Sequence, residues 1–250
     1  MPPTRPPRYS PPSFSSSSFG PGALTPAVRA LIVANVVLFV LAFLVPEITL
    51  RLGLRPADVF GRFAIWQPVT YMFLHGSLSH ILFNMLGLWM FGVELERTWG
   101  TAFFARYYAV CGVGAAATTL LASLLPGSIG DALYPSLTVG ASGAVYGLLL
   151  AYALYYPDRP IYFWMIFPIP AKYFVLIIGA ISLFLSMSQV GGVAHTAHLG
   201  GIVAGYLYLK GGRMRPMAEL TYRYQRWKID RHRRKFDVYP GGRGPGSRVH

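Results

Sequence analysis

The chain has very few acidic residues. Only nine of its 250 residues are Asp or Glu, and three of them, Glu219, Asp230 and Asp237, lie near its C-terminal end. Charged residues make up 12% of the chain and hydrophobic residues 54%, whereas an ordinary soluble domain has about 25% charged residues. Long stretches therefore carry almost no charge. This pattern excludes an ordinary soluble domain and is typical of a protein with several membrane-spanning helices.

Cysteine is also scarce, because Cys111 is the only one in the chain. A single cysteine excludes an intrachain disulfide and a zinc site built on several thiolates. We interpret Cys111 as a small buried residue. His195 lies one turn before His198, but neither an acidic residue nor a His-Glu-x-x-His pattern accompanies the pair. We therefore expect no metal and no cofactor.

The two ends of the chain differ from its apolar centre. Residues 1–25 are rich in proline and serine and contain no apolar segment, which predicts a disordered tail and not a cleaved signal peptide. The net charge is +13, and 12 of the 22 Lys and Arg residues lie between Lys210 and Arg248. Because they follow the last apolar run, we interpret them as a cytoplasmic flank and expect no nucleic-acid binding.

A helical stripe of apolar residues between Met217 and Trp227 gives this basic tail a candidate partner, the surface of an anionic membrane. A plain solvated tail is the alternative.

Six apolar runs of helical length lie between the two tails. A bilayer core is crossed by about 20 apolar residues in a helix. We predict spans at Val28–Val45, Leu78–Val93, Ala102–Leu125, Ser142–Tyr156, Ala171–Met187 and Val193–Lys210. The predicted fold is an all-α membrane protein, with a bundle of six transmembrane helices in residues 26–212 and a basic cytoplasmic tail in residues 213–250.

The placement of Lys and Arg predicts the orientation. Basic residues flank the first and last spans, whereas the third and fifth connections have none. This favours an even number of spans with both termini in the cytoplasm. The first connection, with Arg51, Arg55 and Arg62, fits this rule poorly, but it is long enough to hold interfacial structure of its own.

The fourth span is unusually short. Fifteen residues cover about 22 Å, less than the roughly 30 Å of the hydrocarbon core. Since this span ends on the inside, we expect it to begin at Ser142 below the outer surface. The third connection then has to dip into the membrane, where irregular backbone is tolerated only beside protein or trapped water. Ser142 by itself is better explained as a helix N-cap, and the case for chemistry comes from its neighbours.

Small residues at four-residue spacing run along the fourth and sixth spans. Such stripes let two membrane helices approach closely. The stripes begin beside Ser142 and His198, and comprise the helix-packing glycines Gly143 and Gly147 with Ala151, and Ala197 with Gly201 and Gly205. Packing of the two stripes would bring the Ser142 hydroxyl and the His198 imidazole together.

A serine hydroxyl becomes a strong nucleophile only when a base takes its proton, and histidine suits that role. Neither the fourth nor the sixth span has an acidic residue to orient His198, so a Ser142–His198 dyad is predicted rather than a triad. Tyr146 lies one turn after Ser142. It could stack on the imidazole, or serve only in helix packing.

The second span carries His80 and Asn84, four residues apart and so on one helix face. Polar groups at membrane depth usually mark function. Both side chains can donate hydrogen bonds to a developing oxyanion, as can the backbone N–H of Ser142 at the helix start. The alternative is that His80 and Asn84 only tie helices together.

These motifs together resemble the rhomboid family. The segments are His75 to Asn84, Gly140-Ala141-Ser142-Gly143, and Ala197-His198-Leu199-Gly200-Gly201 followed by Gly205, with Glu94-Leu95-Glu96 and Gly100 after the second span. The resemblance covers about residues 26–212. It implies that Ser142 is the nucleophile and His198 the base, that His80, Asn84 and the Ser142 amide form the oxyanion hole, and that Tyr146 packs on the histidine.

The resemblance also implies an intramembrane serine protease with the six spans of bacterial members, located in a bacterial inner membrane. Its substrates would be membrane proteins cut in or near their transmembrane helices. A catalytically inactive relative that binds and escorts membrane proteins is the main alternative, although such relatives usually lack the serine or the histidine. A small transporter is a third possibility, but transporters usually have charged residues inside their spans. The sequence predicts no oligomeric state.

Overall fold

The structure of the protein is a computed structural model that describes residues 21–163, 167–187 and 192–213. The described residues up to Tyr208 form one compact unit, and the last residues of α11 lie beyond its boundary. Most of the predicted N-terminal tail and nearly all of the basic C-terminal tail, with its predicted lipid-binding stripe, lie outside the described residues.

All six predicted spans are helical within the described residues. The first, third and fourth are α1 (Pro26–Leu44), α7 (Thr101–Ala122) and α9 (Ser142–Tyr155), and the last two are α10 (Ala171–Met187) and α11 (Gly192–Arg213). The second is a continuous run of α5 (Leu78–Gly87), η2 (Leu88–Gly92) and α6 (Val93–Trp99). The ends differ from the predicted ones by a few residues, as frayed helix ends commonly do.

The second span differs most from its predicted length. It was expected to end at Val93 but continues to Trp99. The charged residues Glu94, Glu96 and Arg97 lie beyond the apolar run, but Glu and Arg are good helix formers, so the helix continues to Trp99 and is capped by Gly100. The π-helical turn η2 adds one residue per turn and rotates the following side chains around the axis.

The first connection holds structure of its own. It contains three short helices, α2 (Glu47–Leu52), α3 (Pro56–Arg62) and α4 (Gln67–Thr70), and the 3₁₀ turn η1 (Tyr71–Phe73). The third connection contains α8 (Ser128–Leu133) and then returns to the start of α9. It is held to the first connection by backbone hydrogen bonds between Leu54 and Thr138 at 2.8 and 2.9 Å.

A small β-hairpin joins α9 to α10, a departure from the all-α prediction. Strands β1 (Pro160–Phe163) and β2 (Phe167–Pro170) pair antiparallel. Pro168 and Pro170 lie in β2 and interrupt the helical run before α10. Proline also disfavours the helical conformation in the residue before it, and so favours an extended chain. An extended segment pairs readily where both strands are edges and few N–H groups are needed.

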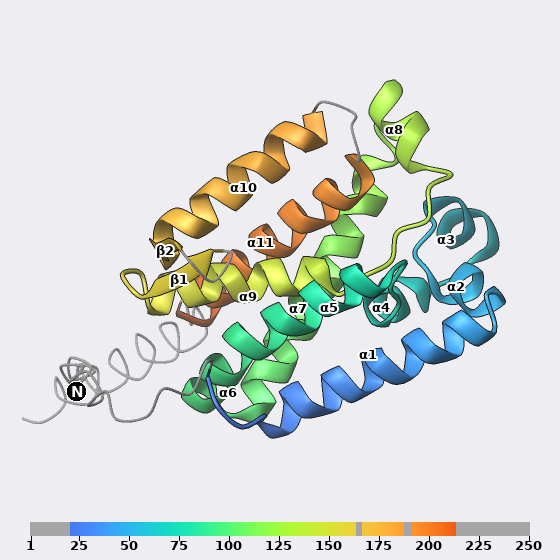
Figure 1. Cartoon of the computed structure of the whole chain (residues 1–250). Coiled ribbons are helices and arrows are strands. Elements are labelled where there is room, and N and C mark those ends of the chain that lie inside the picture. The colour runs from blue at the N-terminus through green and yellow to red at the C-terminus, as the bar shows by residue number, and fades with distance from the viewer. Residues whose placement is uncertain (1–20, 164–166, 188–191, 214–250) are drawn as a thin grey trace, which may run out of the picture. The chain divides into compact units, whose positions relative to one another are not determined.

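Helix α9 lies in the interior of the bundle. Figure 1 shows α1 and α10 at opposite edges with α9 between them. Most residues of α9 are buried, and α9 packs extensively against α7, whose buried side chains include Phe104, Tyr107 and Cys111. Because α9 is enclosed, its first residue, Ser142, is half-buried and lines a cavity instead of the outer face of the bundle.

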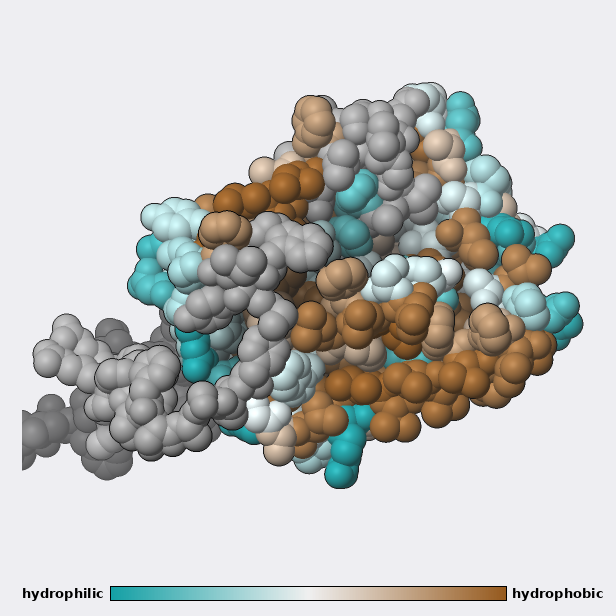
Figure 2. Space-filling view, in the orientation of Figure 1, coloured by the Kyte–Doolittle hydropathy of each residue, from teal (hydrophilic) through white to brown (hydrophobic). Residues whose placement is uncertain are grey.

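The edge helices present apolar side chains outward. On α1 the exposed residues include Val33, Val37, Val40 and Phe43, and on α10 they include Leu176 and Phe184. Figure 2 shows the band along α1 as a continuous hydrophobic strip. Two helical segments in the described chain, Pro26–Leu44 and Leu78–Trp99, are long and apolar enough to cross a membrane, and α9 and α10 are shorter apolar helices.

Glu96, from the end of the second span, caps the start of α1. Its carboxylate accepts hydrogen bonds from the backbone N–H groups of Ala27 and Val28 at 2.9 and 3.0 Å, and from the hydroxyl of Thr25. The Thr101 hydroxyl donates to the same carboxylate at 2.7 Å. The first N–H groups of a helix lack intrahelical acceptors and form its positive end, so a carboxylate there stabilises it. This contact fixes α1 against the helix that carries His80 and Asn84.

Candidate active site

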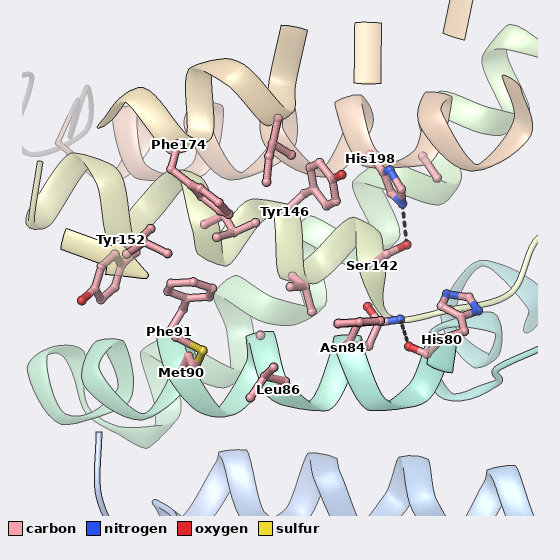
Figure 3. A pocket seen from close by; sticks show the side chains of 18 of the residues that line it. His80, Asn84, Leu86, Met90, Phe91, Ser142, Tyr146, Tyr152, Phe174 and His198 are labelled. Carbon is pink, nitrogen blue, oxygen red and sulfur yellow. Dashed lines mark hydrogen bonds between the residues drawn. The ribbon is translucent and has the colours of Figure 1, made fainter. Parts of the chain in front are cut away.

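Ser142 and His198 face one another across the interface of α9 and α11. The Nε2 atom of His198 lies 2.8 Å from the Oγ atom of Ser142, as the dashed line in Figure 3 marks. The two residues are 56 positions apart in the chain. The Nδ1 atom of His198 is buried and has no hydrogen-bond partner among the described residues. Within the described residues, the arrangement therefore consists of a serine and a histidine, and no carboxylate bonds the Nδ1 atom of His198.

Small residues make this approach possible. A Cβ atom added to Gly201 of α11 would lie 1.9 Å from the carbonyl oxygen of Gly143 in α9. One added to Gly147 would lie 2.4 Å from the sulfur of Cys111 and 3.2 Å from the carbonyl oxygen of Gly201. The distances of 1.9 and 2.4 Å leave no room for a side chain at either glycine. The two glycine stripes thus bring α9 and α11 into backbone contact.

The sequence did not predict the part that α7 plays in this contact. An added Cβ at Gly143 would meet Ala115 at 2.4 Å, and one at Gly205 would meet the Tyr107 hydroxyl at 2.5 Å. Tyr107 also donates a hydrogen bond to the Gly147 carbonyl at 2.8 Å. Helix α7 therefore forms a third wall behind the serine and the histidine. The small residues of α7 were visible in the sequence, but their spacing gave no sign of which helix they face.

Gly140 sets the entry of the chain into α9. Its φ of +125° is one that residues with a side chain rarely adopt. A Cβ there would also lie 2.7 Å from the Nε2 and Cε1 atoms of His80. The Gly140 N–H donates to the carbonyl of Tyr71 at 3.0 Å, which holds this turn against η1. Glycine is thus required both for the backbone conformation and for the space that the His80 ring occupies.

Tyr146 stacks on His198. The ring centroids are 4.1 Å apart and the planes are nearly parallel, at 10°. Figure 3 shows the tyrosine ring beside the imidazole, one helical turn along α9 from Ser142. The ring leaves the Nε2 edge of the imidazole open towards Ser142.

His80 and Asn84 lie across from the start of α9, on α5 (Figure 3). The Asn84 Nδ2 atom donates to the carbonyl of His80 at 3.0 Å, so one amide hydrogen is used within the helix and the second remains. The side chain of Ser77 caps α5 by accepting from the His80 N–H at 3.2 Å. These contacts lie within α5 and its N-cap, and they order the part of α5 that lines the cavity together with Gly140 and Ser142.

Two further histidines lie near this site. His195 meets His198 edge-on with ring centroids 5.7 Å apart. His75 is buried in the loop before α5 and packs edge-on against His80, with centroids 5.0 Å apart. In the described chain, no group of three or more His, Cys, Asp or Glu side chains is arranged to hold a metal ion.

Comparison with known proteins shows the family to which this chain belongs. The family model described as the rhomboid domain matches residues 62–214, more than half of the chain. This chain belongs to the rhomboid family. Rhomboids are integral membrane proteins, and the sequence-based prediction of the family is therefore confirmed.

Several curated rhomboid relatives match at moderate identity. RHOMBOID-like protein 2 of Arabidopsis thaliana is 29% identical over 174 residues, which are 70% of this chain and 50% of that protein. RHOMBOID-like protein 5 of the same plant is 32% identical over 56% of this chain and 42% of its own length. Rhomboid protease GluP of Bacillus subtilis is 26% identical over 64% of this chain and 28% of its own length. The chain thus spans half or less of the curated relatives it matches.

In this rhomboid a cavity of about 1140 Å³ extends from the paired serine and histidine along α9. Near Ser142 its walls include His80, Asn84 and Gly140. Its apolar walls come from the second span, α9 and α10, and include Phe83, Leu86, Met90, Phe91, Leu149, Phe174 and Ile178. The sequence analysis named none of these apolar residues, because apolar side chains in a membrane protein carry no local sign that they face a cavity.

Proposed function

We propose that this rhomboid is an intramembrane serine endopeptidase, with Ser142 as the nucleophile and His198 as the general base. The observation that carries the proposal is the distance of 2.8 Å between Ser142 Oγ and His198 Nε2. At this distance the hydroxyl can donate its hydrogen to Nε2, which removes the proton as Oγ attacks a carbonyl carbon.

The proposed reaction has two steps. Ser142 Oγ adds to the peptide carbonyl, and the protonated His198 then gives its proton to the leaving amine as the C–N bond breaks. A water molecule, deprotonated by the same imidazole, then attacks the resulting ester. The imidazolium returns the proton to Ser142 Oγ as the ester C–O bond breaks, which releases the acid and restores the serine. Because the base has no carboxylate partner among the described residues, the Tyr146 ring is the group proposed to hold its orientation.

The oxyanion of the tetrahedral intermediate is proposed to lie between α5 and the start of α9. Its donors would be the remaining Asn84 amide hydrogen, the His80 imidazole and the backbone N–H of Ser142. The first backbone N–H groups of α9 have no acceptor within their helix. Preorganised donors of this kind stabilise the transition state, which carries the negative charge, more than the substrate.

The proposed substrates are membrane proteins cut in or near a transmembrane helix. The apolar outer faces of α1 and α10 and the apolar walls of the cavity support this class. The inactive escort protein remains the alternative hypothesis, and the labelling experiment below separates the two.

We further propose six transmembrane spans with both termini in the cytoplasm, in a bacterial inner membrane. The distribution of Lys and Arg supports this orientation. A reporter fused after His250 should report the cytoplasm, and one inserted near Asp131 in α8 should report the opposite side. A reporter after His250 that faces outward would contradict the six-span arrangement. Contact of the basic tail with anionic lipid stays a prediction.

The decisive test of the activity is labelling with a fluorophosphonate, which reacts with an activated serine whatever the substrate. The wild-type protein should be labelled and should cleave a model transmembrane substrate, while Ser142→Ala and His198→Ala should do neither. His195→Ala is the matched control, since His195 lies one turn away and does not bond Ser142 in the structure. It should keep most of the labelling. An unlabelled, well-folded wild-type protein would favour the escort hypothesis.

A further inference from the structure

The segment that precedes α1 runs along the second span. Three successive backbone carbonyls of this segment accept hydrogen bonds from two side chains of the span. Arg97 Nη1 donates to the Pro21 carbonyl at 2.6 Å, and Arg97 Nη2 donates to the Ala23 carbonyl at 3.1 Å. Trp89 Nε1 donates to the Gly22 carbonyl at 3.1 Å. Figure 1 shows this start of the described chain beside α6. We call residues 21–23 the strap.

Gly22 gives the strap its shape. Its φ of +85° is one that residues with a side chain rarely adopt. The turn at Gly22 lets the carbonyls before and after it reach the same guanidinium. Two residues after the strap, the Thr25 hydroxyl donates to Glu96. Because that contact fixes the C-terminal end of the strap, closing the short loop costs little conformational entropy.

The strap begins at the inner end of the cavity, the end that lies away from Ser142. Pro21 lines this end together with Glu94, Tyr152, Arg159, Pro160 and Ile161. Asn84 and Glu94 belong to one helical run, so ten residues at 1.5 Å each place the inner end about 15 Å from the serine. The chain that precedes Pro21 therefore joins the protein beside the cavity.

The sequence has one large apolar side chain at this point. Phe19 precedes Pro21 by two residues, which span at most about 7 Å. Residues 15–18 are all serine and residue 20 is glycine, so no other bulky side chain competes with Phe19 for apolar contacts. Phe91 and Ile161 line the cavity near its inner end. An aromatic ring that leaves water for such walls lowers the free energy.

We propose that the N-terminal segment is an intramolecular ligand of the cavity: the strap holds it in place, and the Phe19 side chain fills the inner end. A substrate helix that occupies the full length of the cavity has to displace this side chain. The effect on cleavage rests on the proposed function, because it takes such a helix as the substrate. The binding of Phe19 in the cavity does not depend on that function.

Disulfide trapping tests the position of Phe19 without reference to catalysis. Cys111 is the only cysteine and is fully buried, so an engineered pair reports on itself alone. Met90 lines the cavity one turn before Glu94. A disulfide should form in Phe19→Cys/Met90→Cys, which requires the two Cα atoms to come within about 7 Å. Phe19→Cys/Leu124→Cys is the control, because exposed Leu124 lies beyond the far end of α7 and should not be trapped.

A third change in the trapping pair tests the strap. Arg97→Ala removes two of its three hydrogen bonds and should slow disulfide formation by about two- to tenfold, the effect of losing a net hydrogen bond. Arg106→Ala is the matched control, since exposed Arg106 donates only to the Ala102 carbonyl of its own helix. It should leave the trapping rate unchanged. Melting temperatures in detergent show that each variant is folded.

Cleavage tests the competition with substrate. Phe19→Ser should raise kcat/KM for a transmembrane-helix substrate by about three- to tenfold, the effect expected for a half-buried aromatic side chain. Labelling of Ser142 by a fluorophosphonate should stay unchanged, because the small probe does not reach the inner end. Phe14→Ser is the matched control, because Phe14 lies on the other side of the serine run, and it should cleave at the wild-type rate.

The outcomes of the two tests are distinguishable. Trapping at Met90 that is no faster than at Leu124, or that does not slow in Arg97→Ala, would overturn the binding of Phe19 in the cavity. Trapping without faster cleavage in Phe19→Ser would overturn its competition with substrate. A wild-type protein that is neither labelled nor active would overturn the proposed function, while the disulfide would still decide where Phe19 lies.

Discussion

The imidazole of His198 lies almost flat on the phenol ring of Tyr146, with their centroids 4.1 Å apart and their planes at 10°. Because Tyr146 lies one turn after Ser142 on α9, the helix that supplies the serine also supplies the surface on which the histidine rests. The stack fixes the plane of the imidazole, and the contact between α9 and α11 fixes its distance. In the proposed dyad, these two constraints take the place of the hydrogen-bonded carboxylate of a triad.

The first prediction concerns this stack. Tyr146→Phe keeps the ring and should retain most fluorophosphonate labelling, whereas Tyr146→Ala should label about two- to tenfold more slowly. The range corresponds to the roughly 0.5–1.5 kcal/mol that an aromatic pair contributes beyond buried area. Labelling rates and melting temperatures measured on the same preparations check it. If Tyr146→Ala labels as fast as the wild type, the ring does not orient the histidine.

The second prediction concerns the donors across from Ser142. Asn84→Ala should lower the cleavage rate by up to about 10²–10³-fold, the usual effect of losing one oxyanion donor, with little change in substrate binding. The loss is expected at the smaller end, because His80 and the Ser142 amide remain. Cleavage kinetics and thermal unfolding of Asn84→Ala, His80→Ala and the double variant check it.

These two measurements distinguish a role of Asn84 and His80 in catalysis from a role in helix packing. A lower rate constant at an almost unchanged melting temperature, with the double variant worse than either single one, agrees with an oxyanion hole. A melting temperature so low that it accounts for all the lost activity would show that Asn84, which bonds the His80 carbonyl, serves to hold helices together.

The third prediction concerns the backbone contact of α9 and α11. In Gly201→Ala the new Cβ would lie 1.9 Å from the Gly143 carbonyl oxygen, so the helices have to separate. We expect a loss of about 1–3 kcal/mol of stability, as for other overpacked sites, together with a loss of labelling as His198 moves from Ser142. Gly211→Ala in the same helix is the control, since a Cβ there meets nothing within 4 Å. Equal melting temperatures for the two variants would contradict the close packing.

Much of the fold could be predicted from the sequence, because its signals are local. Apolar length gave the positions of the helices, and most of their ends to within a few residues. Glycine stripes gave the pair of helices that touch, since the spacing of small residues is set by the helical period. The short fourth span was predicted from its length, because Ser142–Tyr156 is too short to cross the hydrocarbon core.

Other features depended on contacts between distant segments. Glu96 caps α1, which begins about 70 positions earlier in the chain, so no local pattern could reveal the contact. The same holds for Glu94 and Arg159, whose ion pair spans 65 positions. The hairpin between α9 and α10 was missed because its prolines break helices and also permit extended edge strands. In each case the residue type limits the interaction, and only the tertiary structure selects the partner.

The last prediction concerns the stability of the protein at low pH. His75 lies in the loop before α5, where burial, and to a smaller extent the neighbouring His80, lowers its pKa to about 4. An unfolded histidine has a pKa of about 6.5. Between these values the unfolded chain binds a proton that the folded chain does not. The free energy of unfolding should therefore fall as the pH drops from about 6.5 to 4, by at most about 1.4 kcal/mol per pH unit for this group.

His75→Gln removes this contribution, because glutamine does not titrate. Melting temperatures in detergent, measured for both proteins from pH 7.5 to pH 4.5, check it. At pH 7.5, where His75 is neutral in both states, the difference between the proteins reports only the altered packing. As the pH falls, the wild type should lose stability more steeply than His75→Gln, so the two curves should converge. Parallel curves over this range would mean that His75 is charged or solvated in the folded protein, against its burial beside His80.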